Sequence, residues 1–234
     1  MLAIYKRELR AYFVTPIGYV CLAIFLAASG FIFALTTLQS QTTNVSSYFS
    51  FSLFLLIIVC ALLTMRLFSE EKKMRTEQLL MTAPVSITGM VAAKFFAAET
   101  VYAIAILLSS LNVIPLYLYA EPYTAQIVGN YIAFFLVGSC FISIGIFMSS
   151  LTENQLAAAV ATIGALLFLL IMNFANGYID LYIFRYVIDW LSVYARYQNF
   201  TAGIFDYNAI LYYCSICFVF LYLTGRVYEK RRWA

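Results

Sequence analysis

Long runs of apolar residues separated by short polar connections make up most of this sequence. A helix that crosses the hydrocarbon core of a bilayer needs about 20 predominantly apolar residues. Stretches of this kind lie at about 17–38, 48–67, 91–119, 124–150, 155–173 and 208–224. The pattern therefore predicts an all-α integral membrane protein, in which a single transmembrane domain with six transmembrane helices covers residues 1–234.

Residues 1–14 have the pattern of an amphipathic helix that lies on a membrane surface. Apolar side chains fall on one helical face, and Lys6, Arg7 and Arg10 fall on the other. This arrangement is typical of an interfacial helix on an anionic leaflet, so we expect contact with membrane lipids. A helix that simply continued into the first span is the alternative, but Pro16 and Gly18 favour a break.

Two later segments depart from a simple span. The stretch 91–119 is longer than a bilayer requires, which predicts tilt or a kink near Asn112–Pro115. Residues 176–206 are apolar and aromatic, but charged side chains interrupt them. One charge at the bilayer centre costs about 2.5–3.5 kcal/mol on insertion scales. We therefore expect an outer re-entrant segment of one or two short helices there, with Arg185 able to pair with Asp189.

Composition supports the membrane assignment and excludes several kinds of chemistry. The chain is 64% hydrophobic and 11% charged, far from the composition of soluble domains. It has no histidine, which excludes His-based metal sites and Ser-His-Asp catalysis. Its five cysteines fall in apolar segments and indicate no disulfide framework. A phosphate-binding P-loop is also missing, so we expect no catalytic site, no metal and no cofactor in this chain.

The distribution of Lys and Arg predicts the orientation. Of the fourteen, twelve lie in the N-terminal helix, in residues 66–94 or in the C-terminal tail. The connections near residues 39–47 and 120–123 have none. Because cytoplasmic loops carry the excess of Lys and Arg, we expect both termini and residues 66–94 to be cytoplasmic.

The charged segment 66–94 predicts a short helix of its own. Ser69 is placed to cap it, and Glu70 and Glu71 suit the positive end of the helix dipole. The helical pattern continues to Met81, and Pro84 ends it because the preceding residue is pushed out of helical geometry.

Two apolar side chains in this segment, Leu79 and Leu80, are expected to be exposed beside charges on the cytoplasmic side. Exposed apolar surface of this kind indicates a binding partner. The alternative is an amphipathic helix that rests on the membrane.

Polar residues within the spans leave open alternatives. Gln155, Thr162 and Asn173 lie on a small, polar face of the fifth span, which fits either a subunit seam beside a translocation path or packing within the chain. Glu99 lies one to two turns into the third span. It is either a gating or proton-coupling carboxylate or, as we favour, an acid near the helix start that Arg66 or Lys94 satisfies.

The run E-E-K-K-x-R-T-E-Q-L-L-x-T-A-P-V-S from Glu70, followed by Lys94, resembles the cytoplasmic coupling helix of ABC-2 type permeases. Those proteins have an E-x-x-x-G-T-x-E-x-L-L-x-x-P-x-S pattern. The resemblance extends over the chain and is closest to the permeases of the gliding-motility group. Arg75 departs from the pattern, because many members have glycine there, and this bears on the backbone turn at that point.

The resemblance implies a permease subunit of an ATP-driven ABC-2 exporter in the bacterial cytoplasmic (inner) membrane. Two permease subunits, as a homodimer or a related heterodimer, would bind separate nucleotide-binding ATPase subunits that hold ATP and Mg. It implies no nucleic-acid partner. The implied partner-binding residues of the coupling helix are Glu70, Glu71, Arg75, Thr76, Glu77, Leu79, Leu80 and Pro84.

Two other functions remain open at this point. A secondary transporter would usually show internal repeats and intramembrane charges, which are not evident here. A non-transporting membrane anchor for an ATPase machine would have the same sequence features.

Overall fold

The structure is a computed structural model that describes residues 1–76, 86–175, 192–201, 203 and 206–232. These residues form helices, and none of them lies in a β-strand. The elements are α1 (Leu2–Val14), α2 (Pro16–Phe33), a π-helical turn (Ala34–Leu38), α3 (Ser46–Thr64), α4 (Ser69–Lys73), α6 (Ile87–Ser109), a 3-10 turn (Ser110–Val113), α7 (Ile114–Tyr119), α8 (Thr124–Leu151), α9 (Gln155–Ala175), α11 (Val193–Thr201) and α12 (Tyr207–Arg232).

The all-α membrane fold is confirmed. Within the described ranges, six helical stretches are long and apolar enough to cross a membrane, and they coincide with the six predicted spans. The third stretch is interrupted where the sequence indicated a kink: a 3-10 turn covers Ser110–Val113, and α7 begins one residue before Pro115. Proline fits the first turn of a new helix, where its missing N–H has no helical acceptor.

The break between the interfacial helix and the first span also follows the sequence. α1 ends at Val14, and Thr15 is extended, with φ −86° and ψ 152°. Pro16 then occupies the first turn of α2. Gly18 allows the two helices to meet closely, because a Cβ there would lie 2.5 Å from the carbonyl oxygen of Tyr12.

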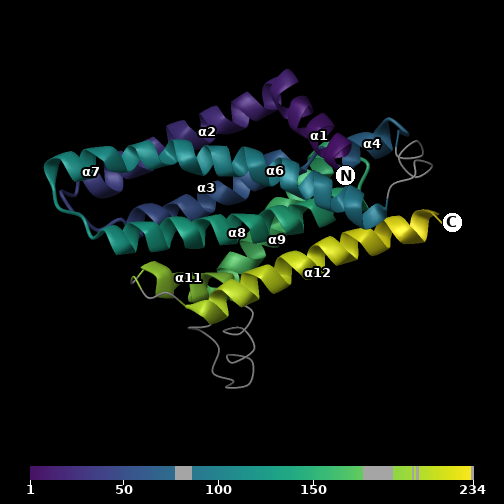
Figure 1. Cartoon of the computed structure of the whole chain (residues 1–234). Helices are drawn as coiled ribbons and strands as arrows, with labels where there is room; N and C mark the ends of the chain where they lie inside the picture. Colours follow the sequence, from purple (N-terminus) through teal and green to yellow (C-terminus); the bar gives the residue numbers. More distant parts are fainter. Residues whose placement is uncertain (77–85, 176–191, 202, 204–205, 233–234) are drawn as a thin grey trace, which may run out of the picture.

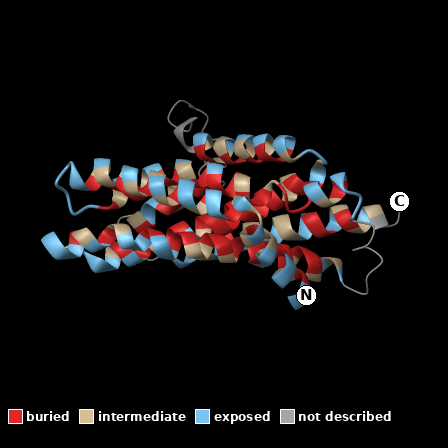
Figure 2. Ribbon diagram, turned by 90° about the horizontal axis from the view of Figure 1, so that it is seen from above, coloured by how far each residue is buried: buried red, intermediate tan, exposed pale blue. Residues whose placement is uncertain are grey.

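The core lies around α8, which packs against α3, α6, α9, α11 and α12. Buried residues lie where the helices face one another, and exposed residues lie on the outer sides of the helices (Figure 2). Two glycines of α8 permit this packing. A Cβ on Gly138 would collide with the ring of Tyr102, and one on Gly145 would collide with the side chain of Thr64.

The two ends of the bundle differ in chemistry. α1, α4 and the C-terminal part of α12 lie at one end, which we call the charged end, whereas α7 lies at the other (Figure 1). At the opposite end, Gln126 donates hydrogen bonds to the hydroxyl of Ser46 and the carbonyl of Thr201, so α11 is tied to the starts of α3 and α8.

The C-terminal tail and the expected re-entrant segment each differ from the expectation or are described only in part. The basic C-terminal tail is helical rather than a separate segment, because α12 continues without interruption to Arg232. Of the expected re-entrant segment 176–206, residues 176–191 lie outside the described residues, and with them the expected pair Arg185–Asp189. The described residues of the remainder include one short helix, α11.

Candidate functional site

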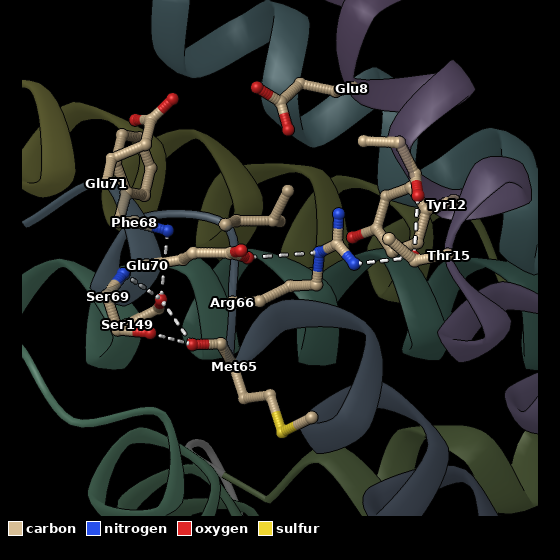
Figure 3. Close-up of polar contacts among 12 residues, drawn as sticks. Glu8, Tyr12, Thr15, Met65, Arg66, Phe68, Ser69, Glu70, Glu71 and Ser149 are labelled. Carbon is tan, nitrogen blue, oxygen red and sulfur yellow. Dashed lines mark hydrogen bonds and ion pairs between the residues drawn. The ribbon is translucent and has the colours of Figure 1, made fainter. Parts of the chain in front are cut away.

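The site is built around α4, the short helix at the start of the charged segment. Its first backbone N–H groups are satisfied by a residue from another helix. The hydroxyl oxygen of Ser149, in α8, accepts from the N–H groups of Phe68 and Ser69 at 3.2 and 3.3 Å, and it donates to the carbonyl of Met65 at 3.1 Å (Figure 3). This corrects the prediction that Ser69 caps α4: the Ser69 hydroxyl donates to the Met65 carbonyl instead.

The end of α4 has the hydrogen bonds of a Schellman motif. The Thr76 N–H donates to the Glu71 carbonyl, and the Arg75 N–H donates to the Lys72 carbonyl, each at 3.0 Å. Arg75 has φ 55°, the left-handed conformation that such a motif requires after the last helical turn. The predicted continuous helix from Glu70 onward is therefore wrong, because α4 ends at Lys73 and the chain turns at Arg75.

Four charged groups from three helices meet beside α4, and we call them the charge square: Arg7 and Glu8 of α1, Glu71 of α4 and Lys94 of α6. The Lys94 ammonium lies 3.0 Å from Glu8 Oε1 and 2.9 Å from Glu71 Oε1. One guanidinium nitrogen of Arg7 lies 2.5 Å from each of the same two oxygens. Each carboxylate therefore contacts both cations, and the four formal charges cancel.

Lys94 is the most deeply buried member of the charge square, with 0% of the residue exposed. Besides its two carboxylates, it donates to the Leu67 carbonyl at 2.7 Å and lies 5.0 Å from the centre of the Phe68 ring. A buried ammonium is stable only with such partners, because an unpaired charge in the interior costs several kcal/mol.

Burial by itself would raise the pKa of the Glu8 carboxyl, but the charges of Lys94 and Arg7 and their hydrogen bonds outweigh that effect. The net result is a pKa below the ordinary value, so Glu8 is ionised at neutral pH.

A second basic residue links the same elements. Arg66 donates to the hydroxyl of Thr15 at 2.8 Å and lies 3.6 Å from a carboxylate oxygen of Glu70 (Figure 3). Its guanidinium is 5.4 Å from the centre of the Tyr12 ring. Tyr12 in turn donates to the Leu63 carbonyl at 2.5 Å. The joint between α1 and α2 is thus bonded to the end of α3.

A groove of about 560 Å³ opens between α1 and α4. Its walls include all four members of the charge square together with Arg66 and Glu70. In the described part of the chain, no group of three or more His, Cys, Asp and Glu side chains is placed to hold a metal ion. The arrangement holds helices together through buried charge and offers a polar surface at the charged end.

The structure describes the predicted partner-binding residues only in part. Glu77, Leu79, Leu80 and Pro84 lie outside the described residues. Arg75 and Thr76 are exposed, and Glu70 is half exposed, whereas the Glu71 carboxylate faces Lys94. A role in partner binding stays a prediction for all of them.

The hydrogen-bond partner of Glu99 differs from the two that the sequence suggested. Neither Arg66 nor Lys94 pairs with it; Ser139 of α8 donates to one carboxyl oxygen at 2.5 Å. The other oxygen is buried and has no hydrogen-bond partner among the described residues. The favoured interpretation, an acid satisfied by a neighbouring cation, is therefore wrong, and a functional role of Glu99 stays a prediction.

The polar face of α9 is split between two environments. Thr162 is buried and donates to the Ala158 carbonyl, whereas Gln155 is partly exposed. Asn173 lies on α9, near its end. A separate row containing Ala157 and Gly164 is exposed, and nothing lies within 4 Å of a Cβ built on Gly164. A subunit seam stays a prediction, and this exposed row is the surface available for it.

Sequence reasoning missed the residues that hold α4 in place: Arg7, Glu8, Lys94 and Ser149. A signal for Lys94 was present, since a lysine seven residues after Ile87 lies well inside an apolar helix and needs a carboxylate. Nothing in the sequence indicated which carboxylates these were, and nothing distinguished Ser149 from the other serines of α8.

A family model described as ABC-2 family transporter protein matches residues 13–233. No curated protein matches the chain.

Proposed function

The chain belongs to the ABC-2 transporter family and is a membrane permease, and on that premise we propose that it is the transmembrane subunit of an ATP-driven exporter. ATP and Mg would be bound by a separate nucleotide-binding subunit. The segment between α4 and α6 would receive the movement of that subunit, and two permease subunits would together form the path for the substrate.

The observation that carries this proposal is the way in which the start of the charged segment is held. α4 is bonded to α8 through Ser149, and to α1 and α6 through the charge square. A loop whose base is attached to three separate membrane helices moves them when it is displaced. A loop that only joined two spans would need no such attachments.

The location of the attachment supports the same function. The charged end contains α1, α4 and the end of α12, which is where the Lys and Arg residues concentrate. The positive-inside rule makes this end cytoplasmic, where ATP is available. The two leucines 79 and 80, which follow the turn at Arg75, are the apolar groups proposed to enter a groove of the ATPase.

The experiment replaces Leu79 and Leu80 with Asp and follows the complex with the ATPase. Charge placed in a desolvated contact costs on the order of several kcal/mol. We expect the variant to insert into the membrane normally but no longer to co-purify with a P-loop ATPase or to stimulate ATP hydrolysis. A matched control places Asp at Leu118 and Tyr119, which are 72% and 89% exposed at the opposite end of the bundle, and should leave the complex intact.

Normal co-purification and stimulation in the Leu79/Leu80 variant would contradict the proposal. Loss of membrane insertion would instead indicate that this segment rests on the bilayer. An ATPase complex that forms normally but moves no substrate would favour the non-transporting anchor.

A further inference from the structure

We propose that Glu71 is a positioning residue for energy coupling: through Arg7 and Lys94 it latches α4 to α1, so that a displacement of α4 also moves the interfacial helix. This inference rests on the proposed function, because it assigns the movement that the ATPase produces to named side chains. It makes α1 a moving part of the coupling mechanism and not only a membrane anchor.

The geometry makes Glu71 the link between the two helices. It extends from α4 to Arg7 of α1 at 2.5 Å and to Lys94 at 2.9 Å. Its neighbour Glu70 points to another partner, Arg66, at the longer distance of 3.6 Å. The two consecutive carboxylates have the same chemistry, but of the two only Glu71 contacts a charged side chain of α1 directly, and this provides an internal control.

Burial makes the latch effective. Lys94 is fully buried, and the side chains of Glu8 and Glu71 are only 10% and 13% exposed. Solvent-exposed pairs are screened and contribute little, whereas removal of one partner from a buried pair leaves an uncompensated charge. While the charge square is intact, α1, α4 and the start of α6 are therefore expected to move together.

Within the charge square, the contacts of Glu71 with Arg7 and Lys94 are the ones that can break when α4 moves. Glu8 lies next to Arg7 on the same helix and keeps that partner wherever α4 goes. Glu71 is held through Oε1 alone, because its Oε2 is buried without a hydrogen-bond partner among the described residues. A buried acceptor without a donor lowers the stability of the arrangement, so release of Glu71 uncouples α4 from α1 and leaves the pair on α1 in place.

α1 can pass the movement to the first span. It meets α2 at Thr15, and this joint is bonded to the end of α3 and the residues that follow it: Thr15 accepts from Arg66, and Tyr12 donates to the Leu63 carbonyl. Movement of α1 therefore changes the tilt of α2 relative to α3.

The test measures two distances in the assembled complex with its ATPase, in a background without the five native cysteines. Spin labels are placed at the exposed positions Leu2 on α1 and Lys73 on α4, and each is paired with a label at Phe218 on α12. Addition of ATP should change both distances in the otherwise unaltered chain. In Glu71→Gln, the change at Lys73 should persist, while the change at Leu2 falls about five-fold or more.

Three further variants separate a latch from a merely structural contact. Glu70→Gln should behave like the unaltered chain. Glu71→Asp keeps the charge but shortens the side chain, so we expect it to lose the change at Leu2. This variant tests the latch if Glu71→Gln folds poorly. Lys94→Arg should retain that change, because the guanidinium can bind both carboxylates.

Each outcome decides between the two proposals. Equal changes at Leu2 in Glu71→Gln and in the unaltered chain would overturn the latch, as would a Leu2 distance that never responds to ATP. If neither distance responds although the ATPase is bound, the proposed function of the segment is wrong as well.

Discussion

At the scale of the residue, Arg75 shows how a backbone requirement can be met by an unexpected side chain. The Schellman motif that ends α4 needs a left-handed residue, and Arg75 adopts φ 55° there. Many ABC-2 permeases have glycine at the matching position of the motif. The turn is therefore of the kind that glycine favours, although the residue differs. Arginine accepts a conformation that costs an L-residue roughly 1–2 kcal/mol.

Two substitutions at Arg75 test this conclusion. Arg75→Gly removes the steric cost but adds freedom to the unfolded chain, so we expect stability to stay the same or rise by up to about 1 kcal/mol. Arg75→Val places a β-branched side chain in the left-handed region and should lower stability by about 1–2 kcal/mol. Thermal unfolding in detergent should show the loss as a fall in Tm of about 2–8 °C. Equal stability of the Gly and Val variants would show that the turn is not maintained in solution.

At the scale of the element, helices with similar composition have different surroundings. α3 and α8 are mostly buried, whereas most residues of α2, α9 and α12 are exposed or only partly buried. In α9, the buried Thr162 faces the bundle while Ala157 and Gly164 face outward. Small residues permit close approach of a second helix within a membrane. We therefore propose the outward row of α9 as the surface that a second permease subunit contacts.

Single cysteines on α9, in a background without the native ones, test for this seam. We expect Ala157→Cys and Gly164→Cys to form disulfide-linked dimers in native membranes upon mild oxidation. Thr162→Cys provides the control, because this buried position faces the bundle and should give no dimer. Cross-linking that is equally weak at all three positions would place the subunit seam on another helix.

At the scale of the whole molecule, α1 and the C-terminal part of α12 lie at the same end of a bundle with six helical stretches, within the described residues, that are long and apolar enough to cross a membrane. α1 and the end of α12 lie together at the charged end, and α7 lies at the opposite end (Figure 1). Fourteen basic residues are distributed unevenly along the chain, and this asymmetry predicts that the charged end is cytoplasmic.

Reporter fusions measure that orientation directly. A reporter joined after Ala234 should be active only in its cytoplasmic form, and one inserted within residues 39–47 only in its exported form. A fusion within 120–123 serves as a second exported control. An exported C-terminus would refute the six-span topology, because a chain with a cytoplasmic N-terminus and an exported C-terminus crosses the membrane an odd number of times.

The sequence by itself determined the membrane class, the six spans, the break before Pro16 and the interruption before Pro115. These features follow from local properties, namely apolar length and the geometry of proline, which need no knowledge of distant residues. The tertiary structure decided the partners of the polar side chains. Lys94 meets Glu8 and Glu71, and Ser149 caps α4, because helix packing brings together residues that lie far apart along the chain. Many carboxylates and hydroxyls could have satisfied these groups equally well, so only the arrangement of the helices selects among them.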